Sequence, residues 1–151
     1  MTWEQVFSLG YKSYAWAMNK LAERIGREKF LNMLEQAASE AVAERVQARL
    51  PLTPQRDLAS FALRIKSGPV WRHALVFDIV EDSAAAFEIR VSQCLWAKTF
   101  RAENAADIGY AAICHPDYLS STTYNPKMQL KRTKTLMRGD DCCNHRWVME
   151  T

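Results

Sequence analysis

Cysteine is absent from the part of the 151-residue sequence that precedes Cys94, and this part contains a single histidine, His73. The other histidines and all four cysteines follow it: Cys94, Cys114, His115, Cys142, Cys143 and His145. Thiols and imidazoles often act as nucleophiles, acid–base groups or metal ligands near neutral pH. Any such chemistry is therefore expected in the C-terminal part of the chain.

Long apolar runs are also lacking. Hydrophobic residues make up 48% of the chain, but their runs are short, such as Ala74 to Phe77, and a bilayer span needs roughly 20 residues. Residues Met1 to Gln5 show no basic region followed by an apolar one, so we expect no secretory signal and a cytoplasmic protein.

Cysteine thiols stay reduced in the cytoplasm, so we do not expect a disulfide framework. Cys142 and Cys143 are neighbours that point to opposite faces of a strand, which argues against a bond between them.

A large charge of one sign is missing as well. The net charge of +3 is mild and does not by itself imply nucleic acid. One stretch is more basic: Lys127, Lys131, Arg132, Lys134 and Arg138. No exposed aromatic residues are interleaved with these cations, as a base-stacking surface requires, so we do not expect nucleic acid as a partner. A solvated strand edge, on which lysines discourage edge-to-edge pairing, is one explanation for the stretch.

Arg132 and Lys134 do not fit that explanation fully. In a continuous strand they share a face with Met128, Leu130 and Leu136. A cation on an apolar face is costly unless it is paired. We therefore expect Arg132 or Lys134 to bind a carboxylate, from the protein or from a ligand.

Helices are predicted for the N-terminal part. Apolar residues recur every three or four positions from Trp3 to Ile25, which predicts a long helix, and a second helix is predicted over 27–49. Thr53-Pro54 has the cap and first-turn pattern of a third helix, which ends at Ser67-Gly68-Pro69. Residues 1–68 are thus expected to form a helical layer.

In residues 70–151 hydrophobic residues recur at every second position, as in strands. This part of the chain is expected to carry the sheet and the site. Alternation over Leu75–Val80 and again over Phe87–Val91 predicts a β-hairpin with one solvated face on its second strand. A helix is predicted over 95–112. It ends at Cys114-His115-Pro116-Asp117, because proline disfavours helix at the residue before it.

A polar loop with Asn125-Pro126 leads to a second hairpin, with strands over 128–138 and 142–149 around the turn Gly139-Asp140-Asp141. The order helices, hairpin, helix, hairpin predicts an α+β fold. In this fold the N-terminal helices pack on a four-stranded antiparallel sheet made of two hairpins. No repeat or linker divides the chain, so residues 1–151 are expected to form a single domain.

The last strand brings a thiol and an imidazole together. Its two-residue period places Cys143, His145 and Trp147 on one face, and Cys142 and Asn144 on the other. The face with Cys143 and His145 is therefore the first place to look for a reactive site.

Several of these residues also form an ordered pattern: Cys94, then Cys114-x-x-Asp117, Asn125, and Thr135-Leu136-x-x-Gly139-Asp140-x-x-Cys143. This pattern resembles that of the L-2-amino-thiazoline-4-carboxylic acid hydrolase family. Its ending, Gly-Asp-x-x-Cys, is more distantly similar to that of 4-vinyl reductase-like small-molecule-binding domains, which share a layout of helices and antiparallel sheet. The hydrolase family commonly has an aromatic residue two places after the last cysteine, where this chain has His145.

The resemblance implies hydrolytic opening of a five-membered thiazoline ring to a carbamoyl-cysteine type of product. Cys114 or Cys143 is then a candidate nucleophile, provided that a neighbour lowers its pKa. His145 or His115 is a candidate acid–base group, oriented or replaced by Asp117 or Asp140. The candidates for substrate binding are Asn125, Arg132, Lys134 and Thr135, with Arg132 or Lys134 holding the carboxylate.

Two alternatives stay open. Cys94, Cys114, Cys143 and His145 form a donor set that suits a tetrahedral zinc or iron site, although no Cys-x₂-Cys or His-x₃-His spacing supports it. The second alternative is that the chain is a non-catalytic domain, which binds a small molecule or metal as a sensor or accessory subunit. The long first helix also suggests a homodimer.

Overall fold

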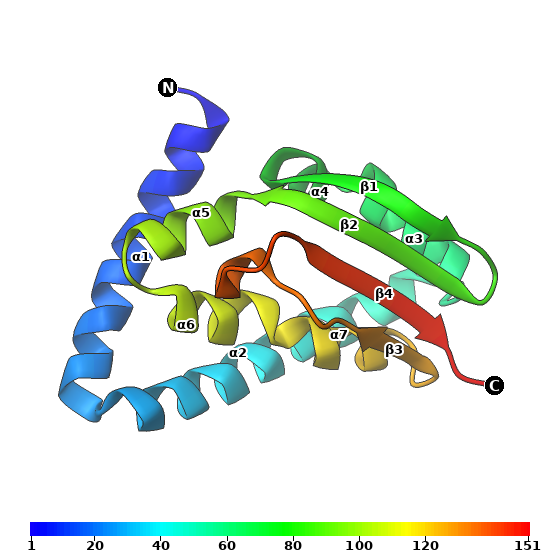
Figure 1. Ribbon diagram of the computed structural model, residues 1–151. Coiled ribbons are helices and arrows are strands. Elements are labelled where there is room, and N and C mark those ends of the chain that lie inside the picture. The colour runs from blue at the N-terminus through cyan, green and yellow to red at the C-terminus, as the bar shows by residue number, and fades with distance from the viewer.

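The computed structural model describes residues 1–151 and shows helices packed against a four-stranded antiparallel sheet (Figure 1). The predicted α+β fold is confirmed. Its elements are α1 (Trp3–Ile25), α2 (Arg27–Arg49), η1 (Leu50–Leu52), α3 (Leu58–Ser67), α4 (Pro69–Ala74), β1 (Leu75–Asp82), β2 (Ala86–Cys94), α5 (Leu95–Ala102), α6 (Ala106–Gly109), η2 (Tyr110–Cys114), α7 (Pro116–Tyr124), β3 (Met128–Lys131), η3 (Leu136–Arg138) and β4 (Cys143–Met149).

The first two helices have the predicted bounds. α1 begins after Thr2, whose hydroxyl accepts the backbone N–H of Gln5, while the Gln5 side chain accepts the backbone N–H of Thr2. Gly26 turns the chain between α1 and α2 at φ 100°, a conformation that favours glycine. As a result, α1 packs on α5 while α2 runs along α7 (Figure 1).

The third helix begins later than predicted. α3 starts at Leu58 and not at Thr53-Pro54, because the Asp57 carboxylate accepts the backbone N–H of Ser60 at 2.8 Å and caps it. The short helix α4 follows, which the sequence pattern did not predict. Pro69 occupies its first turn, where a missing N–H costs nothing.

The strands run antiparallel in the order β1-β2-β4-β3. Ile89 of β2 lies opposite His145 of β4, and Leu130 of β3 lies opposite Trp147. The hairpin β1–β2 is confirmed, and β2 ends at Cys94. The second pair of strands, β3 and β4, forms at the other side of the sheet.

The segment between β3 and β4 differs from its prediction. β3 ends at Lys131, so the strand expected up to residue 138 is wrong. Side chains take the backbone donors that such a strand would use: the Asn144 amide oxygen accepts the N–H groups of Thr133 and Lys134, and Asp140 accepts that of Thr135. The chain leaves the sheet through these contacts and returns at β4.

A helix also replaces the predicted polar loop. The π-helix η2 leads through His115 directly into α7, which Pro116 starts at its first position. Proline therefore begins a helix here, whereas it was expected to end one. This junction places Cys114 and Asp117 at the meeting point of η2 and α7, under the sheet.

The buried face of the sheet carries the main core. Phe87, Ile89 and Trp147 are fully buried against α3 and α7, and the Phe87 and Trp147 rings stack with centroids 5.9 Å apart. The opposite face is polar, and there Arg146 donates to Glu88. A second apolar cluster lies between α1, α2, α5 and α6, and Cys94 packs against both clusters.

None of the helices combines the length and apolar character that crossing a membrane would require. That the whole chain forms one domain stays a prediction.

Candidate active site

The candidate site is a partly enclosed cavity of about 220 Å³ beneath the buried face of the sheet. Its wall is mostly apolar. The lining residues with polar or reactive groups are Trp71, Cys94, Trp96, Cys114, Asp117, Arg132, Cys143 and His145. The four predicted catalytic residues, Cys114, Asp117, Cys143 and His145, therefore all line one cavity.

Arg132 is the centre of the polar network in this cavity. Its Nη1 donates to Asp117 Oδ2 at 2.9 Å and lies 3.0 Å from His145 Nε2, and its Nη2 donates to the Cys114 carbonyl at 2.8 Å. The Arg132 side chain is 1% exposed. Burial works against its charge, but Asp117, together with Cys114 and Tyr118, outweighs burial and raises the pKa of Arg132. The prediction that Arg132 binds a carboxylate is confirmed, and that carboxylate belongs to Asp117.

His145 is held in its neutral form. Burial lowers the pKa of His145, and this effect outweighs the Asp117 carboxylate, 3.7 Å from Nε2, which raises it; the Arg132 charge adds a smaller lowering. An arginine has only donors, so His145 Nε2 must accept the hydrogen bond from Arg132, and the imidazole proton must lie on Nδ1. His145 Nδ1 has no hydrogen-bond partner in the protein. The imidazole therefore offers the cavity one donor and no free base.

The cavity thiols are protonated. Burial raises the pKa of Cys94 to about 11 and also raises the pKa values of Cys114 and Cys143. Attack by Cys114 or Cys143 requires a lowered pKa, and the structure shows the opposite. The Cys143 sulfur accepts the backbone N–H of Leu136 at 3.2 Å, and the Cys94 sulfur accepts that of Ala97 at 3.4 Å; both bonds favour the thiolate but do not offset burial.

Other predicted residues lie outside the cavity. His115 faces α2, where its Nε2 is 3.3 Å from Glu35 and its Nδ1 is 3.4 Å from the Ser39 hydroxyl. Asp140 accepts the backbone N–H of Thr135 and belongs to the segment between β3 and β4. Neither His115 nor Asp140 is positioned to help the cavity residues.

Three predicted substrate-binding residues also lie elsewhere. Asn125 caps the end of α7 and donates to the Arg56 carbonyl at 2.7 Å. Lys134 pairs with Asp141 at the surface, and the Thr135 hydroxyl accepts the backbone N–H of Arg138. Arg132 is thus the one predicted substrate-binding residue that lines the cavity.

The tetrahedral metal site is not formed in the structure. No group of three or more histidine, cysteine, aspartate or glutamate side chains has an arrangement that could hold a metal ion. Cys94, Cys114, Cys143 and His145 all line the cavity, but the His145 nitrogen Nε2 is occupied by Arg132.

Trp96 is a lining residue that the sequence pattern did not assign to the site. Its indole is held by Phe7 and Tyr11 of α1, at centroid distances of 5.1 and 6.1 Å, and its buried Nε1 has no hydrogen-bond partner in the protein. A buried indole N–H normally finds a partner. In the sequence, the only signal that Trp96 could belong to the site was its position two residues after Cys94.

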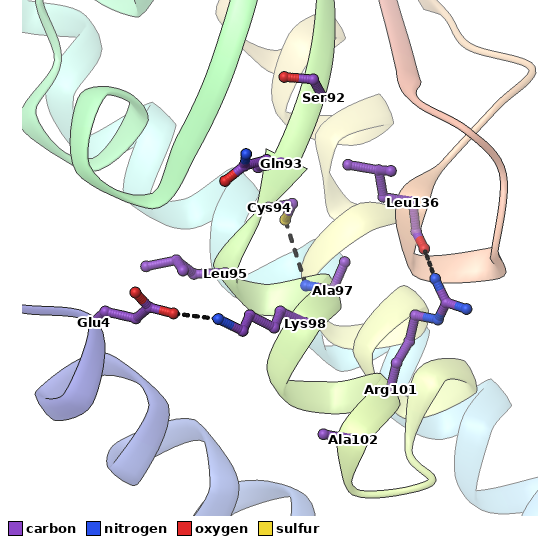
Figure 2. A pocket seen from close by; sticks show the side chains of 10 residues that line it. All are labelled: Glu4, Ser92, Gln93, Cys94, Leu95, Ala97, Lys98, Arg101, Ala102 and Leu136. Atoms are coloured by element: carbon purple, nitrogen blue, oxygen red, sulfur yellow. Dashed lines mark hydrogen bonds and ion pairs between the residues drawn. The ribbon is translucent and has the colours of Figure 1, made fainter.

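A wider surface hollow adjoins the cavity (Figure 2). It lies over the end of β2 and the start of α5. Lys98 pairs there with Glu4, and Arg101 donates to the Leu136 carbonyl, so both cations already have partners. Cys94 lines the hollow and the cavity alike. The hollow holds no histidine or aspartate, which makes the cavity the better candidate site.

The raised thiol pKa values predict a loss of stability at alkaline pH. In the unfolded chain a thiol loses its proton near pH 8.5, whereas folded Cys94 does so near pH 11. Between these values the unfolded state binds fewer protons, so the free energy of unfolding falls as pH rises, by up to about 1.4 kcal/mol per unit for each such thiol. Urea unfolding measured from about pH 8 to about pH 10.5 should show this slope. Cys94→Ala should reduce it, and an equal slope in both proteins would contradict the prediction.

Solved structures confirm the fold. Trafficking protein particle complex subunit 3 from Naegleria fowleri, solved covalently bound to palmitic acid, is similar over 95% of this chain and 96% of its own, with a TM-score of 0.57 and 10% identity. The phenol-responsive sensory domain of the transcription activator PoxR, solved with phenol, is similar over 91% of this chain and 73% of its own, with a TM-score of 0.60 and 8% identity. At such identities the likeness concerns the fold alone.

No curated protein sequence matches the chain significantly. The sequence profile of one family does match, over residues 7–147, and this range contains every residue that lines the cavity. The chain belongs to the L-2-amino-thiazoline-4-carboxylic acid hydrolase family.

Proposed function

We propose that the cavity is the place where this chain hydrolyses the thiazoline ring, and that Asp117 is the base. Family membership implies hydrolysis of L-2-amino-thiazoline-4-carboxylate. The observation that supports the cavity is the Asp117–Arg132–His145 network in its wall. Buried, paired groups of this kind beside a cavity are typical of functional sites.

The size and chemistry of the cavity suit this substrate. About 220 Å³ is below the roughly 300–1,000 Å³ of sites for drug-sized ligands, and the substrate is one five-membered ring with an amino and a carboxylate group. The amidine part is basic and the carboxylate is acidic. The cavity presents the Asp117 carboxylate and, beside it, the unpartnered donors of Arg132 and His145. The basic amidine and the acidic carboxylate of the substrate thus each have a complementary group in the wall.

Asp117 is arranged to activate a water molecule. Its Oδ2 accepts from Arg132, which leaves Oδ1 for another partner, and its side chain is 31% exposed. The water oxygen attacks the amidine carbon while its proton passes to Asp117. The tetrahedral intermediate then breaks its bond to the ring sulfur or ring nitrogen, and Asp117 returns the proton to the leaving atom. The product is a carbamoyl-cysteine that contains one water more than the substrate.

Arg132 and His145 position this base. The guanidinium orients the carboxylate of Asp117, and His145 stays neutral because its Nε2 accepts from the same guanidinium. His145 therefore acts as a donor at Nδ1 and not as the base. This assignment differs from the acid–base role expected from sequence, because Arg132 occupies the nitrogen that a base would use.

A cysteine site is the alternative route within the same cavity. Cys143 would attack the amidine carbon after losing its proton to Asp117, and water would then release the product. All four cysteines are free thiols, which suits the reducing cytoplasm proposed for this chain. The raised pKa of the Cys143 thiol favours water as the nucleophile.

Turnover of L-2-amino-thiazoline-4-carboxylate by wild type and Cys143→Ala tests the proposal. Mass spectrometry should detect a product one water heavier, and Cys143→Ala should retain kcat within about tenfold, because water and Asp117 remain. Cys142→Ala, one residue before β4 and outside the cavity lining, is the matched control. Loss of all turnover in Cys143→Ala alone, with a covalent adduct in quenched wild type, would establish the cysteine route instead. Saturable binding without product in wild type would indicate a non-catalytic binding domain.

We also propose a homodimer formed through α1. This helix leaves Val6, Leu9 and Trp16 at least half exposed, at 50%, 59% and 55%. Its N-terminal half extends beyond the sheet in Figure 1. Light scattering on the purified protein tests the proposal, and a mass of one chain would contradict it.

A further inference from the structure

Three residues that line the cavity each carry a buried nitrogen without a hydrogen-bond partner in the protein. These nitrogens are Trp96 Nε1, Arg132 Nε and His145 Nδ1, and no other buried side-chain nitrogen or oxygen of the chain lacks a partner. All three residues line the same cavity. Buried polar atoms are nearly always paired, so three unpaired ones at one place indicate a ligand that pairs them.

Each of these nitrogens is a donor. The indole nitrogen of Trp96 and the Nε of Arg132 always carry a hydrogen. His145 Nδ1 carries the imidazole proton because Nε2 accepts from Arg132. The wall therefore offers three donors and no acceptor at these positions, which suits a group that only accepts hydrogen bonds.

We infer that Trp96, Arg132 and His145 form the subsite for the substrate carboxylate. This inference rests on the proposed function, because it takes the substrate to lie in the cavity. A carboxylate is an acceptor-only group with room for about four hydrogen bonds. Hydrogen bonds to an ionised group are also the strong ones. Both Nη nitrogens of Arg132 already donate within the protein, and Nε is the guanidinium nitrogen without a partner.

The donors are held in place before any ligand arrives. The His145 ring stacks on Trp147 with centroids 5.4 Å apart and meets the edge of Trp71 at 6.2 Å. The Trp96 ring packs against Phe7 and Tyr11 of α1. Arg132 is fixed by its bonds to Asp117 and to the Cys114 carbonyl. A carboxylate that binds here orders few side chains, which favours affinity.

The subsite predicts selection for carboxylate-bearing rings. We compare L-2-amino-thiazoline-4-carboxylate with 2-amino-2-thiazoline, the same ring without the carboxylate. Wild type should have the lower KM for the carboxylate compound. Trp96→Phe keeps the aromatic packing but removes one donor, so KM for the carboxylate compound should rise roughly 10- to 100-fold, the scale of one hydrogen bond to a charged group. KM for 2-amino-2-thiazoline should stay unchanged.

Two tryptophans provide controls. Trp71→Phe changes the cavity wall without removing one of the three buried unpartnered donors, so it should alter KM for both compounds by the same factor. Trp16 lies on α1, where its indole donates to Glu103, and Trp16→Phe should leave both KM values unchanged. An equal effect of Trp96→Phe on the two compounds, or no effect on either, would overturn the subsite.

Calorimetric titration separates this inference from the proposed hydrolysis. If wild type binds the carboxylate compound more tightly than 2-amino-2-thiazoline, and Trp96→Phe does not, the subsite is supported even when no product forms. The absence of product would refute only the proposed hydrolysis. Equal affinities of wild type for the two compounds overturn the subsite, whether or not the ring is opened. The comparison of the two compounds on wild type needs no variant, so it does not depend on whether Trp96→Phe folds.

Discussion

Asp117→Asn should lower kcat for ring opening by roughly 10²- to 10⁴-fold, the range that a general base contributes. Asparagine has nearly the shape of aspartate, and its amide oxygen still accepts from Arg132, but it cannot take a proton from water. KM should change much less than kcat. Steady-state kinetics, normalised to the folded fraction from a thermal melt, measure this effect.

Two further variants make the result specific. Asp107→Asn removes a carboxylate that also pairs with an arginine, Arg27, but at the surface and away from the cavity, so kcat should not change. Asp117→Glu keeps the charge beside Arg132 and displaces the carboxylate by one methylene, so the fold should be retained while kcat still falls. Full activity in Asp117→Asn would remove Asp117 from the mechanism.

Arg132→Met should lower the free energy of unfolding by about 3–5 kcal/mol, as expected when one partner of a buried ion pair is removed. The change leaves the Asp117 carboxylate, His145 Nε2 and the Cys114 carbonyl without their donors. Equilibrium unfolding in urea measures the loss. Activity should fall as well, because the base is no longer oriented.

The surface pair Arg27–Asp107 again supplies the control. Its side chains are 41% and 42% exposed, so Arg27→Met should cost less than about 1 kcal/mol. Arg132→Lys keeps the positive charge but not the two-nitrogen geometry of the guanidinium. Its free energy of unfolding should therefore lie between those of wild type and Arg132→Met. If Arg132→Met were as stable as Arg27→Met, the network would not support the fold.

The parts of the site that depend on local periodicity could be predicted. Cys143 and His145 share a face because side chains in a strand alternate, and Arg132 was expected on the apolar side because it shares parity with Leu130. Asp117 was expected beside a cysteine because Cys114 is close to it in sequence. In the structure all of these residues line the cavity.

The parts that depend on distant contacts could not be predicted. The segment after Lys131 leaves the sheet because the Asn144 side chain takes the backbone donors of Thr133 and Lys134, a choice that no local pattern reveals. The raised pKa of Cys114 follows from burial by elements far apart in the chain. The unpartnered Trp96 donor likewise depends on α1 and on the cavity.

The most direct test of the central claim is a crystal structure of Asp117→Asn soaked with L-2-amino-thiazoline-4-carboxylate. The claim predicts an intact ring in the cavity, with its amidine carbon beside residue 117 and its carboxylate near Trp96, Arg132 and His145. A ligand bound in the hollow over α5 (Figure 2), or beside His115 and Glu35, would contradict it.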